Sequence, residues 1–249
     1  MPLLVTEAVV LHAFDYLETS RIFRLATREA GMQSVLARGA RRSARRFGTA
    51  LDLFAEGSAQ IYTKSGRELN TLAALDVTRS RPELGTDLDR FTAASAVAEL
   101  ALRFVRDDAH PELFDAIRGA LDGIAGAAPG GAQEAGLAGM WRIVAELGFA
   151  PSLDECASCR APLDPAATVA FSHPAGGALC DRCRRLHAGS RALPAEARAA
   201  LRAWIGGRRV ALGDDASARA HQRLLREFLR EHLSDERPLR AYAAWERSL

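Results

Sequence analysis

The chain of 249 residues is 48% hydrophobic and 26% charged, a balance that provides enough apolar side chains for the cores of two or three small domains. No stretch approaches the apolar length that a membrane span requires, and the N-terminus lacks the basic start and apolar run of a targeting segment. We therefore expect a cytoplasmic protein without a membrane partner. The net charge of +2 hides an uneven distribution, because residues 81–150 are acidic on balance and both flanking segments are basic.

The first 80 residues are rich in β-forming side chains and are interrupted by short polar or glycine-containing segments. The expected strands are Val5–Phe14, Ile22–Thr27, Met32–Ala37, Leu51–Tyr62 and Leu69–Leu75. Gly57 interrupts the fourth strand and indicates a bulge or bend. Five short strands in this length favour a small antiparallel barrel such as the OB-fold, although other small barrels share the pattern.

Positive charge is concentrated between the third and fourth expected strands. No acidic residue occurs from Ala30 through Leu51, and this stretch contains Arg38, Arg41, Arg42, Arg45 and Arg46. Charge of this density predicts an exposed loop, which is either merely solvated or binds an anion. On a small barrel the phosphate backbone of nucleic acid is the favoured anion. The aromatic residues that either stack on bases or pack in the barrel are Tyr16, Phe23, Phe47 and Tyr62.

From Pro82 onward the apolar residues recur at helical spacing. The expected helices cover Leu88–Val105, a segment from Pro111, a segment that ends at Gly148, Pro194–Ile205 and Ser217–Leu233, with a short closing segment after Pro238. One face of the last long helix aligns Arg219, Arg223, Arg226 and Arg230. This face is either a solvated surface or a binding site for an acidic partner.

The four cysteines of the chain form two Cys-x-x-Cys pairs, Cys156 with Cys159 and Cys180 with Cys183. Two such pairs supply the four thiolates of a closed tetrahedral Zn²⁺ site, and the glycine- and proline-containing spacer predicts loops and a short hairpin. His173 or His187 could replace a cysteine as a ligand. Disulfides and free thiols are the alternatives, but cytosolic thiols stay reduced. Because four thiolates leave no open position, we expect one structural zinc ion without a catalytic role.

The order of these features resembles the bacterial recombination-repair family RecO. Local stretches that carry the resemblance are 15–21, 27–31, 37–42 and 238–240, and the likeness covers essentially the whole chain. It is strongest over residues 5–75 and at the cysteines. Two positions depart from the family pattern: Leu17 stands where a small or glycine-like residue is usual, and Arg38 stands where lysine is frequent.

The resemblance implies a DNA-binding mediator of recombination and repair that is not an enzyme and has no small-molecule substrate. Members of this family bind single- and double-stranded DNA, promote annealing, contact RecR and the tail of the single-strand-binding protein (SSB), and help to load recombinase onto covered DNA. The chain contains no phosphate-binding loop, nucleophile elbow or His-Glu-x-x-His sequence. A zinc-stapled nuclease, suggested only by the acidic pairs Asp107–Asp108 and Asp214–Asp215, and a protein-only scaffold are the alternatives.

The expected architecture is therefore α+β, with a zinc module inserted into a helical domain. We expect an OB-fold-like nucleic-acid-binding barrel over residues 1–80, the first part of the helical domain over 81–150, the zinc module over 151–190 and the second part of the helical domain over 191–249. DNA binding is assigned to the arginine-rich loop, and partner binding to the arginine face of the last long helix.

Overall fold

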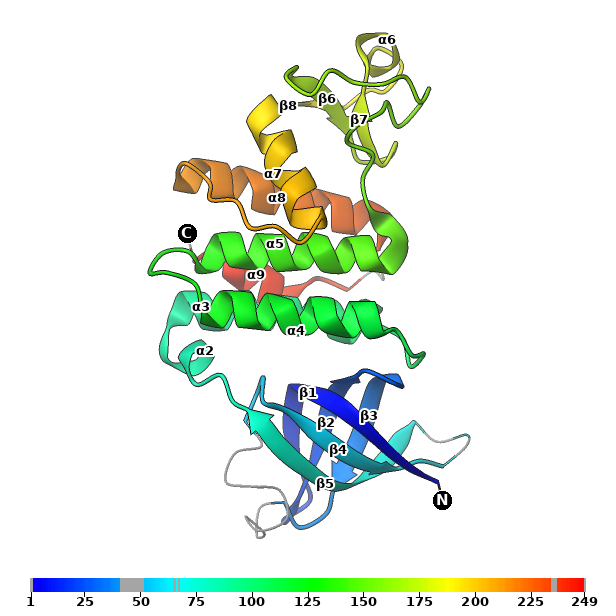
Figure 1. Cartoon of the computed structure of the whole chain (residues 1–249), viewed down its shortest axis with the longest axis vertical. Helices are drawn as coiled ribbons and strands as arrows, with labels where there is room; N and C mark the ends of the chain where they lie inside the picture. The colour runs from blue at the N-terminus through cyan, green and yellow to red at the C-terminus, as the bar shows by residue number, and fades with distance from the viewer. Residues whose placement is uncertain (1, 41–51, 65, 67, 234–236, 249) are drawn as a thin grey trace.

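The computed structural model describes residues 2–40, 52–64, 66, 68–233 and 237–248. A β-barrel occupies one end of the elongated molecule, a small cysteine-containing module occupies the other, and the helices lie between them (Figure 1). This arrangement confirms the predicted α+β class and the predicted order of its parts. Among the described residues, no helix is long and apolar enough to cross a membrane.

The N-terminal domain is a closed barrel with the strand order β1-β2-β3-β5-β4. Its strands are β1 (Leu3–Tyr16), β2 (Ser20–Thr27), β3 (Gly31–Ala37), β4 (Glu56–Tyr62) and β5 (Leu69–Arg79). β3 and β5 pair in parallel, and the other neighbours pair antiparallel. Alternate side chains fill the interior, where Phe23, Leu25, Val35 and Ile61 are fully buried. The predicted five-stranded, OB-like barrel is thus confirmed.

The fourth strand begins at Glu56, five residues later than the sequence pattern predicts. Phe54 has a φ of 69°, and its side chain leaves the barrel to pack in the helical core. The expected irregularity at Gly57 is confirmed by a register shift between Glu56 and Gly57. A Cβ atom at Gly57 would lie 2.2 Å from the carbonyl oxygen of Asp76, so only glycine allows the close approach of β5.

The helical domain follows the predicted periodicity closely. Its elements are α2 (Glu83–Thr86), α3 (Leu88–Phe104), α4 (Pro111–Ala125), α5 (Ala132–Val144), the π-helical turn η1 (Ala145–Phe149), α7 (Ala195–Ile205), α8 (Asp215–His232) and α9 (Arg240–Glu246). Side chains of Asp87, His110 and Asp214 accept backbone N–H groups at the starts of α3, α4 and α8. Gly148 lies within η1 with a φ of 87°, so the helical backbone that continues from α5 stops at the predicted residue.

Small residues let the central helices approach one another closely. A Cβ atom at Gly139 of α5 would lie 2.4 Å from the Cβ of Ala120 in α4. The remaining space is filled by large rings, and the side chains of Trp141, Trp204 and Trp245 are almost completely buried. The alanine-rich stripe of α3 therefore forms core, as the sequence predicts.

The barrel is fixed to the helices by backbone contacts at the β2–β3 turn and by ion pairs. Met32 N–H donates to the carbonyl of Arg106 at 2.8 Å, and a Cβ atom at Gly31 would lie 2.2 Å from that oxygen. Arg28 donates to Asp115 of α4 at 2.5 Å, and this bond lowers the pKa of the Asp115 carboxyl. The acidic excess of residues 81–150 thus partly neutralises arginines of the barrel.

Arg81 forms the most buried of these links. Its guanidinium is 1% exposed and donates to Glu56 at 2.5 Å, to Asp122 at 2.7 Å and to the carbonyl of Phe54 at 2.7 Å. Arg79 donates to the same Asp122 carboxylate at 2.8 Å. These contacts connect the end of β5 to the start of β4 and to α4, so they join the two domains at a single charged cluster.

Candidate metal centre and nucleic-acid interface

The first Cys-x-x-Cys pair is shaped by a tight turn. Cys156 N–H donates to the carbonyl of Ala161 at 2.8 Å, and Arg160 N–H donates to the carbonyl of Cys156 at 2.9 Å. Arg160 adopts a φ of 62°, which closes the turn immediately after Cys159. Both sulfur atoms consequently point to the same side of the turn, toward the second pair.

The second pair stands at the start of the short helix α6 (Asp181–Arg184), which follows a hairpin of β6 (Val169–Ser172) and β7 (Gly177–Leu179). Cys180 is the residue before the helix, and its carbonyl accepts from Arg184 N–H at 2.9 Å. Cys183 lies one turn along. The hairpin confirms the predicted nature of the spacer, and β8 (Arg191–Leu193) adds a third strand beyond residue 190.

The four sulfur atoms lie within 4.8 Å of one another, and those of Cys159 and Cys180 are 3.8 Å apart. A tetrahedral site with zinc–sulfur bonds of about 2.3 Å requires sulfur–sulfur distances of about 3.8 Å. The donor set therefore fits a closed four-thiolate metal site. Among the described residues, these cysteines are the only group of metal-binding side chains that lies close enough together to hold an ion.

The surroundings of the sulfurs favour a bound cation. Burial raises the pKa of Cys156, but N–H groups of Cys180, Cys159 and Ser158 directed at its sulfur bring the pKa down to about 6. Burial and the neighbouring thiols raise the pKa of Cys183 to about 11. The first thiol of the cluster therefore loses its proton easily. Loss of the last proton is unfavourable unless a cation balances the charges of the crowded thiolates.

The two histidines considered as alternative ligands lie outside this cluster of donors. His173 is mostly buried between the module and α8, where its Nε2 lies 3.3 Å from the carbonyl of Leu224. Nε2 of His232 lies 2.8 Å from the carbonyl of His173. The contacts of His173 therefore attach the module to the helical domain, and Phe171 adds an apolar contact with Phe228.

The arginine-rich segment leaves the barrel at the end remote from the helices. Arg21 pairs with Ala37 across β2 and β3, so exposed Arg38 emerges beside the β1–β2 turn. The β2–β3 turn at the opposite end contacts the helical domain. The other candidate residues of this segment, which lie outside the described residues, are Arg41, Arg42, Arg45, Arg46 and Phe47.

The candidate stacking residues divide into two classes. Phe23 is completely buried in the barrel and is a core residue. Tyr16 and Tyr62 are each 41% exposed on the outer surface. The structure adds two rings that the sequence analysis did not single out, His12 and exposed Phe14. The alternate spacing of positions 12, 14 and 16 along one strand is the sequence signal that could have identified them.

The arginine face of α8 is less uniform than its spacing suggests. Arg219, Arg223 and Arg230 are exposed, whereas Arg226 donates to both carboxylate oxygens of Glu246 in α9, at 2.5 and 2.6 Å. Arg223 borders a cavity of about 260 Å³. The apolar residues that line this cavity are Ala192, Leu193, Pro194, Ala197, Ala220 and Leu224, and Arg191 and Glu227 also border it.

The acidic pairs that suggested a nuclease have structural positions. Asp214 accepts Ser217 N–H at 2.8 Å as the cap of α8, and this bond lowers the pKa of its carboxyl. Asp108 lies in the segment after α3, where its backbone closely approaches Gly31 of the barrel. Neither pair belongs to a group of metal-binding side chains within the described part of the chain.

Comparison with known proteins identifies relatives of this fold and site. Residues 1–81 match the family described as Recombination protein O N terminal, and residues 85–241 match Recombination protein O C terminal. The DNA repair protein RecO of Anaeromyxobacter dehalogenans is 40% identical over 90% of this chain and 89% of its own length.

Two further relatives cover most of the chain. The DNA repair protein RecO of a Nocardioides species is 34% identical over 97% of this chain and 98% of its own. That of Myxococcus xanthus is 32% identical over 91% of each. These matches extend over the barrel, the helices and the cysteine module together, and the chain therefore belongs to the RecO family of DNA repair proteins.

Proposed function

We propose that this protein is a DNA-binding recombination mediator without enzymatic turnover. It binds single- and double-stranded DNA, promotes annealing of complementary strands and, together with RecR, helps to load recombinase onto DNA covered by SSB. Membership of a DNA repair family supports the general role. The proposal further places the protein in the cytoplasm at the nucleoid and takes the four segments 1–80, 81–150, 151–190 and 191–249 as its functional units.

One observation carries the DNA-binding proposal: exposed Arg38 begins a run of five arginines at the free end of an OB-like barrel. Three arginines where the barrel meets the helices are occupied, because Arg28, Arg79 and Arg81 form ion pairs with Asp115 and Asp122. DNA backbone is attracted to arginines that can exchange counterions, and the charge density of this run predicts an exposed loop that could do so.

The test is a set of binding isotherms at several salt concentrations for labelled single strands. The variant Arg41→Gln/Arg42→Gln/Arg45→Gln/Arg46→Gln should bind more weakly, and the slope of log affinity against log salt should shrink by up to about 0.7 for each lost phosphate contact. Thermal stability should change little, because an exposed loop has few packing interactions to lose. Unchanged affinity and salt slope in this variant would show that the loop is not part of the DNA-binding surface.

We further propose that Arg219 and Arg223 bind the acidic tail of SSB, with the neighbouring apolar cavity holding an apolar residue of that tail. Arg230 belongs to the same exposed face, whereas Arg226 is already paired with Glu246. Charge reversal at Arg219 and Arg223 should weaken the binding of a tail peptide measured by calorimetry, without lowering the melting temperature. Arg226→Glu is the matched comparison, since it should cost stability by placing a second carboxylate beside that of Glu246. If the double variant binds the tail peptide as tightly as the parent does, this face of α8 is only a solvated surface.

We propose that the ion in the four-cysteine site is one structural Zn²⁺, and that its role is to hold the module folded. The closed geometry supports this role because four thiolates leave no position for water or substrate. Metal content by mass spectrometry should give one zinc per chain.

Incubation with labelled DNA and Mg²⁺ separates the mediator from the nuclease, because only a nuclease would cleave the DNA. Absence of any salt-dependent DNA binding would favour the protein-only scaffold.

The mediator role itself is tested by two assays with purified components. Annealing of complementary oligonucleotides should be faster with this protein than without it. Recombinase loading on SSB-covered single strands should require both this protein and RecR, and leaving out either one should abolish the stimulation. Faster annealing without any effect on loading would reduce the proposal to strand annealing alone.

A further inference from the structure

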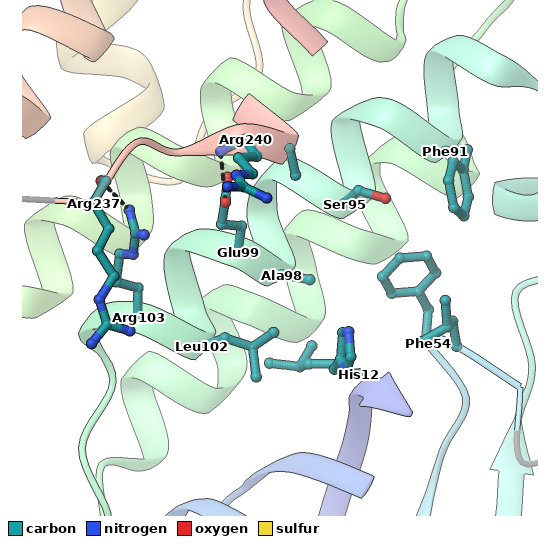
Figure 2. A pocket seen from close by; sticks show the side chains of 13 residues that line it. His12, Phe54, Phe91, Ser95, Ala98, Glu99, Leu102, Arg103, Arg237 and Arg240 are labelled. Carbon is teal, nitrogen blue, oxygen red and sulfur yellow. Dashed lines mark hydrogen bonds between the residues drawn. The ribbon is translucent and has the colours of Figure 1, made fainter. Parts of the chain in front are cut away.

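A groove runs between the barrel and the helical domain, with a cavity of about 650 Å³. We call it the interdomain groove, and Figure 2 shows the side chains that line it. Phe54 and Phe91 form one end, where their rings meet edge to face at 6.5 Å. Arg103 and Arg237 form the other end. The groove therefore changes from aromatic to cationic along its length.

The rim of the groove carries additional positive charge. Arg240 is exposed, and its guanidinium forms no ion pair with any described residue, although its backbone N–H donates to Glu99 at 2.8 Å. Glu99 also accepts Tyr242 N–H at 3.0 Å. Among the described lining residues the one carboxylate, that of Glu99, is therefore engaged by backbone N–H groups at the start of α9 and does not pair with the Arg240 guanidinium.

A β-bulge in β1 continues the groove onto the outer face of the barrel. Val10 pairs with Leu25 and His12 with Arg24, so Leu11 is the extra residue of the bulge. Leu11 packs in the helical core, and beyond the bulge the alternation reverses. Ala13 then packs against the barrel interior, while His12 and its alternate neighbours face outward.

The outward side chains form a continuous row of rings, which we call the β1 ring row: His12, Phe14 and Tyr16. His12 itself lines the interdomain groove, and its ring centroid lies 5.8 Å from that of Phe14. Phe14 and Tyr16 are 43% and 41% exposed. Arg24, which is half-buried, lies opposite His12 on the same face, and its buried Nε has no hydrogen-bond partner within the described part of the chain.

We propose that the β1 ring row and the interdomain groove together form a binding surface for single-stranded nucleic acid, separate from the arginine-rich loop. Unpaired bases stack on the rings and on Phe91, and the phosphates lie against Arg24 and Arg240. The inference rests on the proposed function and specifies where the strand runs. In this arrangement the nucleic-acid strand runs from the β1–β2 turn, beside Arg38, along β1 and into the groove.

Both parts of this surface suit a nucleotide chain. Alternate residues of a strand are about 6.6 Å apart, so successive rings meet successive bases of an extended strand. Stacking tolerates any base because every base has an aromatic face, and cations beside the rings bind the backbone. An acidic peptide ending in an aromatic residue could occupy the groove alone, but it would not contact Phe14 and Tyr16, the two exposed rings that continue the row outside the groove. The row therefore favours a nucleic acid.

The test compares single-strand and duplex binding in the same variants. Phe14→Ala/Tyr16→Ala should bind a labelled oligothymidylate roughly tenfold more weakly per lost ring, with an unchanged salt slope. A duplex of equal length should bind as before, because paired bases cannot stack on the rings. Arg24→Gln/Arg240→Gln should instead reduce the salt slope by about 0.7 per lost contact.

Phe149→Ala is the matched control. Phe149 is another exposed ring, 36% against 43% for Phe14, but it lies on η1 and not on the barrel. It should leave both affinities unchanged, and circular dichroism should show all variants folded. A 2-aminopurine base placed in the oligonucleotide should report quenching with the parent protein and lose it in Phe91→Leu.

The outcomes separate this inference from the function it rests on. If the parent protein binds no oligonucleotide, both fail. If it binds and the arginine-loop variant is weakened while the ring-row variant is not, only this inference fails. If the ring-row and Arg240 variants no longer bind an acidic peptide that ends in phenylalanine but bind the single strand as tightly as the parent, the groove is a peptide site and the inference is overturned. A loss of single-strand affinity equal to the loss of duplex affinity also overturns it.

Discussion

The barrel and the cysteine module stand at opposite ends of the molecule and hold their shapes by different means (Figure 1). The barrel closes its sheet around an apolar interior that includes Phe23, Leu25 and Ile61, and every strand has two neighbours. The module has four short elements, and the buried members of its own cluster are only Cys156, Ala170, Leu179 and Cys183. Two of these four are cysteines of the candidate metal site.

The difference shows what each region needs in order to stay folded. A closed barrel of five strands buries its backbone polar groups and its side chains without help. A segment of about forty residues with so small a core needs an external constraint, and a metal ion or docking against a larger domain supplies it. The module docks on α8 through Phe171 and His173, and its four cysteines are close enough together to hold a metal ion. At the barrel interface the Arg81 side chain forms an ion pair that is almost completely buried, whereas the pairs that Asp154 and Arg191 of the module form with α7 and α8 are partly exposed.

The largest expected effect comes from removing one metal ligand. Cys180→Ser should lower the zinc content and the melting temperature together, because metal binding supplies much of the folding free energy of a small metal-held module. Hydrogen exchange should accelerate over residues 152–193 and stay unchanged in the barrel strands. Leu186→Ala is the control, because this neighbouring side chain is 78% exposed and has little packing to lose. A zinc-free variant with unchanged exchange and melting would show that docking alone holds the module.

The buried charge at the barrel interface should give the next largest effect. Arg81→Met should cost about 3–5 kcal/mol of unfolding free energy, because Glu56 and the carbonyl of Phe54 lose their donor while they stay buried. Adding Glu56→Gln should recover part of the loss by removing the stranded charge. Chemical denaturation followed by circular dichroism measures both changes.

The matching change in the module is Arg184→Ala, which removes an exposed pair with Asp181 at 3.6 Å. This variant should change the free energy of unfolding by less than about 1 kcal/mol, since exposed ion pairs contribute little. Equal losses at Arg81 and Arg184 would contradict the contrast between a charge-linked barrel and a metal-held module.

The sequence predicts most of this architecture because its signals are local. Alternation gives the strands, helical spacing gives α3, α4 and α8, and the two Cys-x-x-Cys pairs give the metal site. The fourth strand begins later than predicted because Phe54 packs on the helices, a contact whose partners are remote in the sequence. The single-residue bulge at Leu11, which turns His12 and Phe14 outward, likewise depends on pairing between strands.

Surface charges show the same limit. The spacing of α8 predicts that its four arginines are aligned, but it does not reveal that Glu246 of α9 accepts Arg226. It also does not reveal that Asp115 and Asp122 of α4 engage the arginines of the barrel. Periodicity identifies which face of a helix is polar, whereas the partner of each charge is set by elements that fold against it from elsewhere in the chain.

The helices beside the module should respond to acid in a way that the barrel does not. Burial lowers the pKa of His221 to about 4, and its ring packs against Trp204 at 4.8 Å. The folded pKa lies below the usual value of about 6.5, so the unfolded chain binds the additional proton and stability falls as the pH falls from about 6.5 toward 4. Between pH 7 and pH 5 the loss is about 2 kcal/mol.

His221→Gln removes this titrating group. The unfolding free energy of the parent minus that of the variant, plotted against pH, therefore isolates the contribution of His221 from that of the cysteines. The variant should lose less stability than the parent between pH 7 and pH 5, whatever its stability at pH 7. His12→Gln is the control on the barrel, because that side chain is exposed. Parallel profiles for the parent and His221→Gln would show that His221 does not couple folding to pH.

The smallest expected effect compares two exposed leucines, one at each end of the molecule. Leu17 in the β1–β2 turn has a φ of 54°, a conformation that costs a side chain with a Cβ about 1 kcal/mol or more and glycine very little. Leu186 of the module is equally exposed, 78% against 76%, but does not have a positive φ. Leu17→Gly should therefore stabilise the barrel by about 0.5 kcal/mol after the added freedom of the unfolded chain is subtracted, whereas Leu186→Gly should destabilise the module by a similar amount. Leu17→Ala keeps the Cβ and should bring no gain, so a rise in the denaturation midpoint for alanine as large as that for glycine would attribute the effect to the exposed side chain instead of the backbone of the turn.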